Sequence, residues 1–221
     1  MSTDTKRRLL DGAMRAIRDH GIAGVSARTI AAAAGVNQAL VFYHFGSVDE
    51  LLAAACTANT AARVETYAER FAGVESLGEL LEVGRALHEE ERRAGNVFVL
   101  AQLFAGAQSD PKLGPPVAAA LQLWIDQVES VLRRLLAGSP FAEVADIPGL
   151  ARAVSAAFIG LELFEGVDEV GARHALDALG QLAVLIEVVD ELGPVARRAL
   201  RAKLSRANTR RARKAVSSRK A

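Results

Sequence analysis

Polar and basic side chains gather near the start of the chain, in two short segments over residues 26–33 and 37–44 that are predicted to be helices. Ser26 and Asn37 are residue types that cap helix N-termini, and Gly35 between the segments allows a tight turn. Two helices joined in this way can place the second in the major groove of DNA, with the first crossing the phosphate backbone. The chemistry indicated is hydrogen bonding to phosphates and base edges.

The spacing of apolar residues gives the two segments an inner and an outer face. The side chains expected inside are Ile30, Ala34, Val36, Leu40 or Val41, and Phe45, with Phe42 also expected in the domain core. The side chains left for the groove are Asn37, Gln38, Ala39, Tyr43 and His44. Arg28 and Thr29 lie on the first turn of the preceding helix, where a cation can reach a phosphate or a guanine edge.

Helical spacing continues through most of the chain, and alanine and leucine outnumber β-branched and aromatic residues. We therefore expect an all-α protein, with helices over residues 5–19, 26–33, 37–44, 47–71, 76–93, 96–107, 111–137, 148–165 and 168–192. Ser47 with Glu50 and Ser76 with Glu79 have the spacing of capping boxes. The apolar stripe expected on the first helix is Leu9, Leu10, Ala13, Met14 and Ile17.

The formal net charge of +1 over 221 residues is a cancellation. Residues 1–50 hold six basic and five acidic residues, residues 51–193 hold ten and twenty-one, and residues 194–221 hold eleven and none, giving +1, −11 and +11. Such asymmetry favours a polyanionic partner such as nucleic acid. We expect the basic tail to begin as a helix and to end in disorder.

The stretch TKRRLLDGAMRAIRDHGIAGVSARTIAAAAGVNQALVFYHFGSVDELLAAA, residues 5–55, resembles the DNA-binding domain of the TetR family of bacterial transcriptional regulators. The resemblance rests on an ordered set of elements: His20-Gly21 after the first helix, SARTIA over residues 26–31, AGV over residues 34–36, FYHF over residues 42–45 and SVDEL over residues 47–51. It covers the first quarter of the chain. Two positions depart from the family pattern: Phe42 stands where tyrosine is usual, and Val48 where lysine is usual, and both usual residues contact the phosphate backbone.

The resemblance implies a helix-turn-helix domain over residues 1–48, a helical effector-binding and dimerisation domain over residues 49–193, and leaves the basic tail, residues 194–221, unexplained. It implies a homodimeric repressor that binds a palindromic operator in double-stranded DNA and is released by a small-molecule effector. The expected DNA-binding residues are Ser26, Arg28, Thr29, Asn37, Gln38, Ala39, Tyr43, His44 and Ser47. The alternative is an architectural or non-specific nucleic-acid-binding protein that uses the basic tail.

The second domain offers two candidate surfaces. Residues that could line a cavity, or simply form core, are Phe71, Phe98, Gln102, Phe104, Trp124, Phe158 and Glu162. The last two long helices are apolar on more than one face, which favours a subunit contact over extra burial within one subunit. The residues expected at this contact are Ala153, Ala157, Gly160, Leu161, Phe164, Leu176, Leu179, Ala183 and Ile186. In the TetR family these two helices pair with their two-fold mates in a four-helix bundle.

Other function classes find little support. The chain has no phosphate-binding glycine loop, no G-x-S-x-G and no H-E-x-x-H, so we expect no enzyme and no cofactor. The single cysteine, Cys56, excludes an internal disulfide, and His88 beside Glu89, Glu90 and Glu91 is expected to be a solvated charge run and not a metal site. Without a signal peptide or an uninterrupted apolar span, we expect a cytoplasmic protein without a membrane partner.

Overall fold

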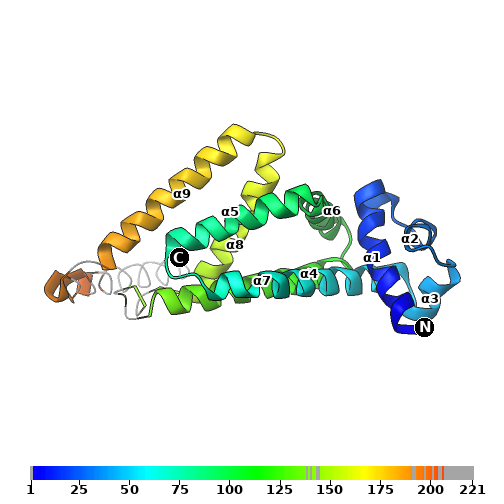
Figure 1. Ribbon diagram of the computed structural model, residues 1–221, viewed down its shortest axis with the longest axis horizontal. Helices are drawn as coiled ribbons and strands as arrows, with labels where there is room; N and C mark the ends of the chain where they lie inside the picture. The colour runs from blue at the N-terminus through cyan, green and yellow to red at the C-terminus, as the bar shows by residue number, and fades with distance from the viewer. Residues whose placement is uncertain are drawn as a thin grey trace, which may run out of the picture. The chain divides into compact units, whose positions relative to one another are not determined.

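The computed structural model describes residues 2–137, 139, 141–142, 145–190, 193–196, 198–200, 202–203 and 206, except for the side chains of residues 2, 182–183, 185–187 and 189–190. Within this part the regular elements are all helical, as expected (Figure 1). They are α1 (Ser2–His20), the 3-10 helix η1 (Ile22–Gly24), α2 (Ala27–Ala34), α3 (Ala39–Phe45), α4 (Val48–Ala72), α5 (Leu77–Arg93), α6 (Asn96–Ser109), α7 (Gly114–Leu135), α8 (Ile147–Glu165) and α9 (Glu169–Asp190).

The chain divides into two compact units. The first contains residues 1–70 and 84–127, and the second contains residues 71–83 and 128–221. The first unit therefore holds α1, η1, α2, α3 and α6 whole, with α4 up to Arg70 and parts of α5 and α7. The second holds α8 and α9, which pack against each other. A functional boundary at residue 48 stays a prediction, because the helix-turn-helix segment shares its unit with later helices.

The core of the first unit begins on α1. Leu9, Ala13 and Ile17 on its expected stripe are fully buried, and they pack in one cluster with residues of α2, α3, α4, α6 and α7. Gly12 permits a close approach of α1 and α2, since a Cβ built there would lie 2.8 Å from the Cβ of Ala34. The amphipathic spacing of α1 thus predicts its buried side correctly.

The ends of α2 are held by local hydrogen bonds. Ser26 and Thr29 form a reciprocal capping box, in which the Ser26 hydroxyl accepts from the Thr29 amide at 3.1 Å and the Thr29 hydroxyl accepts from the Ser26 amide at 2.8 Å. At the other end, Gly35 adopts φ +63°, which ends the helix. Arg8 donates to the carbonyl oxygens of Ala34 and Gly35, so a side chain of α1 satisfies the exposed end of α2.

Several expected helix boundaries are wrong by two or three residues, including the start of α1, which lies at Ser2 and not at residue 5. The helix expected over 111–137 begins at Gly114, because the chain first turns at Asp110, whose carboxylate accepts from the Lys112 amide at 2.9 Å. Pro115 and Pro116 then occupy the first turn of α7, where a missing amide hydrogen costs little. The helix expected from residue 37 begins at Ala39.

The second unit contains a helix pair with well-capped ends. Asp146 caps α8 by accepting from the Gly149 amide at 3.1 Å, and Asp168 caps α9 by accepting from the Gly171 amide at 2.9 Å. Ala151 is fully buried on α8 and Ala172 is nearly so on α9. The described residues 194–196, 198–200, 202–203 and 206 have helical backbone, as expected for the start of the tail, and its expected disordered end lies outside the described residues.

Candidate nucleic-acid interface

α3 presents a buried and an exposed side, as its sequence predicts. Val41 is fully buried, and Leu40 and Phe45 pack partly buried against the core of the first unit. Gln38, at the start of the helix, and Ala39 are exposed, and Tyr43 is 79% exposed. These contacts fix the direction in which α3 faces away from the protein.

Arg28 is the exposed cation on the first turn of α2. It stands beside Ser26 and Thr29, whose hydroxyl groups already bond to each other's backbone amides. The expected DNA contacts at Ser26 and Thr29 therefore compete with capping, while the guanidinium of Arg28 is presented to solvent at a helix N-terminus. This is the geometry in which a helix end and a cation together favour a phosphate.

The expected polar residues next to α3 and α4 also serve as caps. The Asn37 side-chain oxygen accepts from the Ala39 amide at 2.8 Å, and the Ser47 hydroxyl accepts from the Glu50 amide at 3.1 Å. Asn37 keeps its amide nitrogen for another partner, because only its oxygen is used in this bond. Both residues thus hold helix starts at the edge of the exposed α3 surface.

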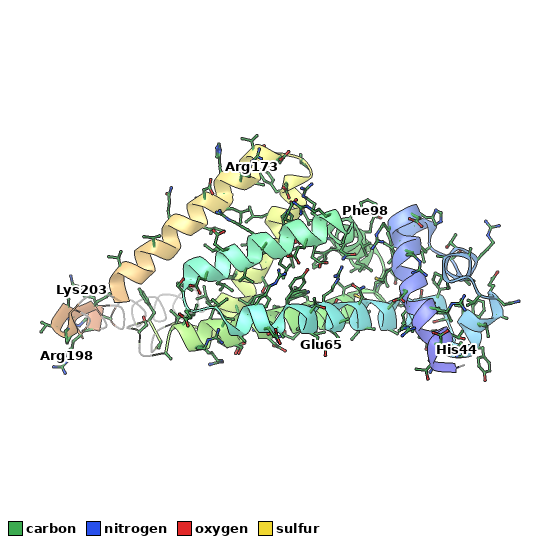
Figure 2. The ribbon with its side chains drawn as sticks, in the orientation of Figure 1. His44, Glu65, Phe98, Arg173, Arg198 and Lys203 are labelled. Carbon is green, nitrogen blue, oxygen red and sulfur yellow. The ribbon has the colours of Figure 1, made fainter. Side chains whose placement is uncertain are left out.

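Tyr43 and His44 form an aromatic pair at the end of α3. Their rings lie 4.9 Å apart between centroids and are inclined by 77°, an edge-to-face arrangement. His44, labelled in Figure 2, is partly buried, whereas Tyr43 stands out into solvent. The Tyr43 hydroxyl therefore lies at the exposed end of α3, where a partner can reach it.

The expectation for Phe42 was wrong. Its side chain is 49% exposed, because Val41 and Phe45 occupy the inner side of the short helix. Val48, at the position where the family pattern has lysine, is partly buried against the core. Neither residue can donate a hydrogen bond to a phosphate from its side chain, and α3 contains no lysine or arginine.

A polar network in the first unit was missed by the sequence reasoning. Glu91, expected in a solvated charge run, is only 8% exposed. Its carboxylate accepts from the Tyr67 hydroxyl at 2.9 Å and from the Asn96 amide at 2.7 Å, and it lies 3.3 Å from the Arg63 guanidinium. Arg18 of α1 donates to the side-chain oxygen of Asn96 at 3.0 Å. The network therefore links α1 to α6, α5 and α4 through side chains.

Charges around this network shift the titration of their neighbours. Burial raises the pKa of Tyr67, and the carboxylates of Glu91 and Glu90 that accept from its hydroxyl raise it further. The hydrogen bond from Arg70 lowers the pKa of Glu90, and Arg70 also lies over the Tyr67 ring at 5.2 Å. The helical spacing of Tyr67 predicts a buried aromatic residue but does not reveal which acids its hydroxyl reaches.

The expected cavity residues are divided between the two units. Phe98, Gln102, Phe104 and Trp124 belong to the first unit, and Phe71, Phe158 and Glu162 to the second. Gln102 accepts from the Ile22 amide at 3.0 Å, so it ties α6 to the turn after α1. Phe104 packs against the core, whereas Phe98, labelled on α6 in Figure 2, is 48% exposed. Phe71 and Glu162 are buried, and a shared ligand site for the set stays a prediction.

The expected subunit-contact residues on α8 and α9 leave a surface uncovered. Ala153, Ala157, Gly160 and Phe164 are exposed, and Leu161, Leu176 and Leu179 are partly buried. A Cβ built at Gly160 or Gly180 would meet nothing within 4 Å. The side chains of Ala183 and Ile186 lie outside the described residues. Among the described residues, no group of three or more His, Cys, Asp or Glu side chains could hold a metal ion.

Comparisons with known proteins place these features in one family. Residues 9–55 match the model described as bacterial regulatory proteins, tetR family. The HTH-type transcriptional repressor AcnR of Corynebacterium glutamicum is 28% identical over 109 residues, 49% of this chain and 54% of the relative. The chain thus spans about half the length of the curated relatives it matches.

Solved structures resemble the chain over a longer stretch. A TetR-family transcriptional regulator from Rhodococcus sp. superposes with a TM-score of 0.70 at 22% identity, covering 83% of this chain and 98% of that one. The multidrug binding protein EbrR in complex with malachite green gives a TM-score of 0.60 at 27% identity, covering 80% and 97%. The helix-turn-helix segment, residues 9–55, thus matches the tetR family of bacterial regulatory proteins, and most of the helical chain shares its fold with solved structures.

Proposed function

We propose that the protein is a homodimeric repressor that binds a palindromic DNA operator through α3 and releases it when a small molecule binds its helical body. The observation that carries the proposal is the exposed side of α3. The inner side of this helix is buried, and the preceding helix, α2, is capped at its start and carries the exposed Arg28 on its first turn. The AcnR relatives, named as transcriptional repressors, support the same direction of regulation. The protein acts by binding, without catalysis.

Gln38 is the side chain on α3 best suited to hydrogen-bond a base edge. Its amide is exposed at the start of the helix and caps nothing, whereas the oxygen of Asn37 is already used. A glutamine amide can pair with adenine through two hydrogen bonds, which contribute about 1–3 kcal/mol of discrimination. Gln38→Ala should therefore weaken binding to the preferred sequence about tenfold or more, while leaving non-specific binding unchanged.

The experiment selects preferred sequences from a random DNA pool and then measures affinity by gel shift at two salt concentrations. Gln108→Ala is the matched control, since Gln108 is also an exposed glutamine but lies on α6. The proposal expects a two-fold symmetric site with half-sites about 34 Å apart or a multiple of that distance. Binding of equal strength to all sequences would favour the alternative, a non-specific nucleic-acid-binding protein that uses its +11 tail. In that case, removal of residues 205–221 would abolish DNA binding.

The homodimer is proposed to form through α8 and α9. Large apolar side chains are exposed along the pair: Leu163 at 40%, Phe164 at 48%, Val184 at 55% and Val188 at 51%. Such a surface is expected to be covered in solution. Gly160→Trp should convert dimer to monomer in sedimentation velocity without loss of helical circular dichroism. Glu65→Trp adds the same ring to an exposed site on α4, labelled in Figure 2, and should leave the dimer intact.

The proposed effector response uses the network that ends on α1. Tyr67 and Trp124 lie with ring centroids 6.2 Å apart beside Glu91, and the network continues through Asn96 to Arg18. A ligand that shifts these side chains would change how α1 is held, and so the population of DNA-binding states. Malachite green, bound by EbrR, is the first probe: quenching of Trp124 together with release of operator DNA is the expected result.

The proposed location is the bacterial cytoplasm, where the DNA lies. Taken singly, α8 is the one described helix long and apolar enough to cross a membrane, with a mean hydropathy of 1.5. The dimer contact proposed for α8 accounts for its apolar character without a membrane.

A further inference from the structure

The middle of the exposed side of α3 is apolar. An α-helix turns by about 100° per residue, so each side chain of α3 can be placed by its angle around the helix axis from the buried Val41. Phe42 lies at about 100° and Ala39 at about 160°. Gln38 lies at about 60° and Tyr43 at about 200°. Ala39 and Phe42 therefore lie at the centre of this arc, with Gln38 and Tyr43 at its edges. All four side chains are exposed, Phe42 by 49% and Tyr43 by 79%.

The chemistry of Phe42 limits what it can contact. It has no hydrogen-bond donor for a phosphate oxygen, and α3 has no lysine or arginine to direct its central surface toward the backbone. Within the protein, the apolar side of α3 is already filled by Val41, Leu40 and Phe45. The ring of Phe42 thus remains available to an apolar group of a partner.

One apolar group is presented by bases in the major groove, the C5-methyl of thymine. Ala39 lies next to Phe42 on the exposed side and is small, so it allows the helix to approach the base edge closely. We infer that Phe42, beside Ala39, contacts a thymine methyl group in each half-site, so that this phenylalanine determines part of the sequence specificity. The inference rests on the proposed operator binding by α3.

The test replaces thymine by uracil, which removes the methyl group and keeps every hydrogen bond of the base pair. The thymines of the selected operator are replaced one position at a time, in both half-sites together. For each position, the ratio of the dissociation constants of the uracil and thymine forms is measured on one protein preparation. Burial of one methyl-sized group contributes about 0.8 kcal/mol, or about fourfold. Two symmetric contacts should therefore raise the dissociation constant about 15-fold at one thymine position of the half-site.

Variants of Phe42 assign the effect to this side chain. In Phe42→Ala the ratio at the sensitive position should fall to about one, whereas Phe42→Leu, which keeps an apolar group, should retain a ratio well above one. Because the ratio compares two DNAs with the same protein, partial unfolding of a variant cancels out. Uracil replacement at thymines outside the selected site is the DNA control and should change nothing.

Two results would overturn the inference, and they differ in what else they overturn. If a preferred sequence is recovered but no thymine is sensitive to uracil, or the sensitivity persists in Phe42→Ala, then Phe42 does not contact a methyl group while operator binding stands. If no preferred sequence is recovered, the proposed repressor function fails and the inference fails with it.

Discussion

The side-chain amide of Asn96 lies between Arg18 of α1 and the buried carboxylate of Glu91, so replacing it with a carboxylate tests the network directly. In Asn96→Asp, an acidic oxygen takes the place of the amide nitrogen that donates to Glu91 at 2.7 Å. Two like charges about 4 Å apart cost about 4 kcal/mol at the effective dielectric of a protein surface. The exposed Arg18 would offset up to about 1 kcal/mol of this.

Protonation sets a second limit on the cost. A carboxyl group with an ordinary pKa near 4 takes up a proton at pH 7 for about 4 kcal/mol, since each pH unit corresponds to about 1.4 kcal/mol. The variant pair can share one proton, which restores a hydrogen bond between the two side chains. We therefore expect a loss of about 3 kcal/mol in the free energy of unfolding at pH 7.

The loss must depend on pH in a defined direction. The acidic pair of the variant has a raised apparent pKa in the folded state, so its stability is intact near pH 4 and is lost as the pH rises toward 7. Measured against the wild type at each pH, the penalty should be below about 1 kcal/mol at pH 4.5 and should rise with pH to about 3 kcal/mol at pH 7, with a slope of at most about 1.4 kcal/mol per pH unit. Urea unfolding followed by fluorescence of Trp124, the sole tryptophan, measures it beside the network.

Two control variants separate charge from other effects. Asn96→Ala removes the hydrogen bond to the buried Glu91 carboxylate and the exposed one from Arg18, and should cost about 1.5–3 kcal/mol without the pH dependence. Gln122→Glu creates the same acid pair at an exposed site, where Gln122 donates to Asp126 at 2.7 Å, and should cost less than about 1 kcal/mol. A penalty in Asn96→Asp that does not change between pH 4.5 and 7, or one no larger than in Gln122→Glu, would refute the reasoning.

Three further outcomes follow from single residues. Burial raises the pKa of Cys56 to about 11, so at pH 8 about one thiol in a thousand is ionised and reaction with Ellman's reagent should follow the unfolding rate; rapid labelling of the native protein would contradict this. Gly35→Ala places a side chain at φ +63° and 3.0 Å from Arg8, and should cost about 1–2 kcal/mol in urea unfolding; an unchanged free energy of unfolding would contradict this. The ion pair with Asp49 raises the pKa of Lys112 but is exposed, so Lys112→Ala should change the melting temperature little; a shift above about 4 °C would show that the pair matters more than its exposure implies.

The sequence predicted the helices and caps of the DNA-binding segment because these depend on neighbours in the chain. Ser26, Gly35 and Ser47 act within three or four residues of themselves, and the stripe on α1 depends only on helical period. The predicted starts of α3 and α7 were less accurate. Asn37 and Asp110 each accept from a backbone amide two residues on, and each does so from a turn that precedes the helix.

Phe42 and Glu91 show where local reasoning failed. Phe42 lies between Val41 and Phe45, which are both on the inner side of α3, and so its position suggests a core residue. A helix of seven residues buries only one side, however, and Phe42 lies outside that side. Glu91 lies in a run of acids that looks solvated, but Tyr67, 24 residues away, and Asn96 at the start of the next helix enclose it.

The sequence by itself determined that the protein is helical, that its first quarter is a helix-turn-helix and that its charge is divided between an acidic body and a basic tail. These properties follow from period, capping residues and composition, all of which are local or additive along the chain. Only the tertiary structure decided which exposed side chains α3 presents and which groups connect α1 to the body. Both depend on which helices pack together, because burial and long-range hydrogen bonds are made by residues that the sequence separates.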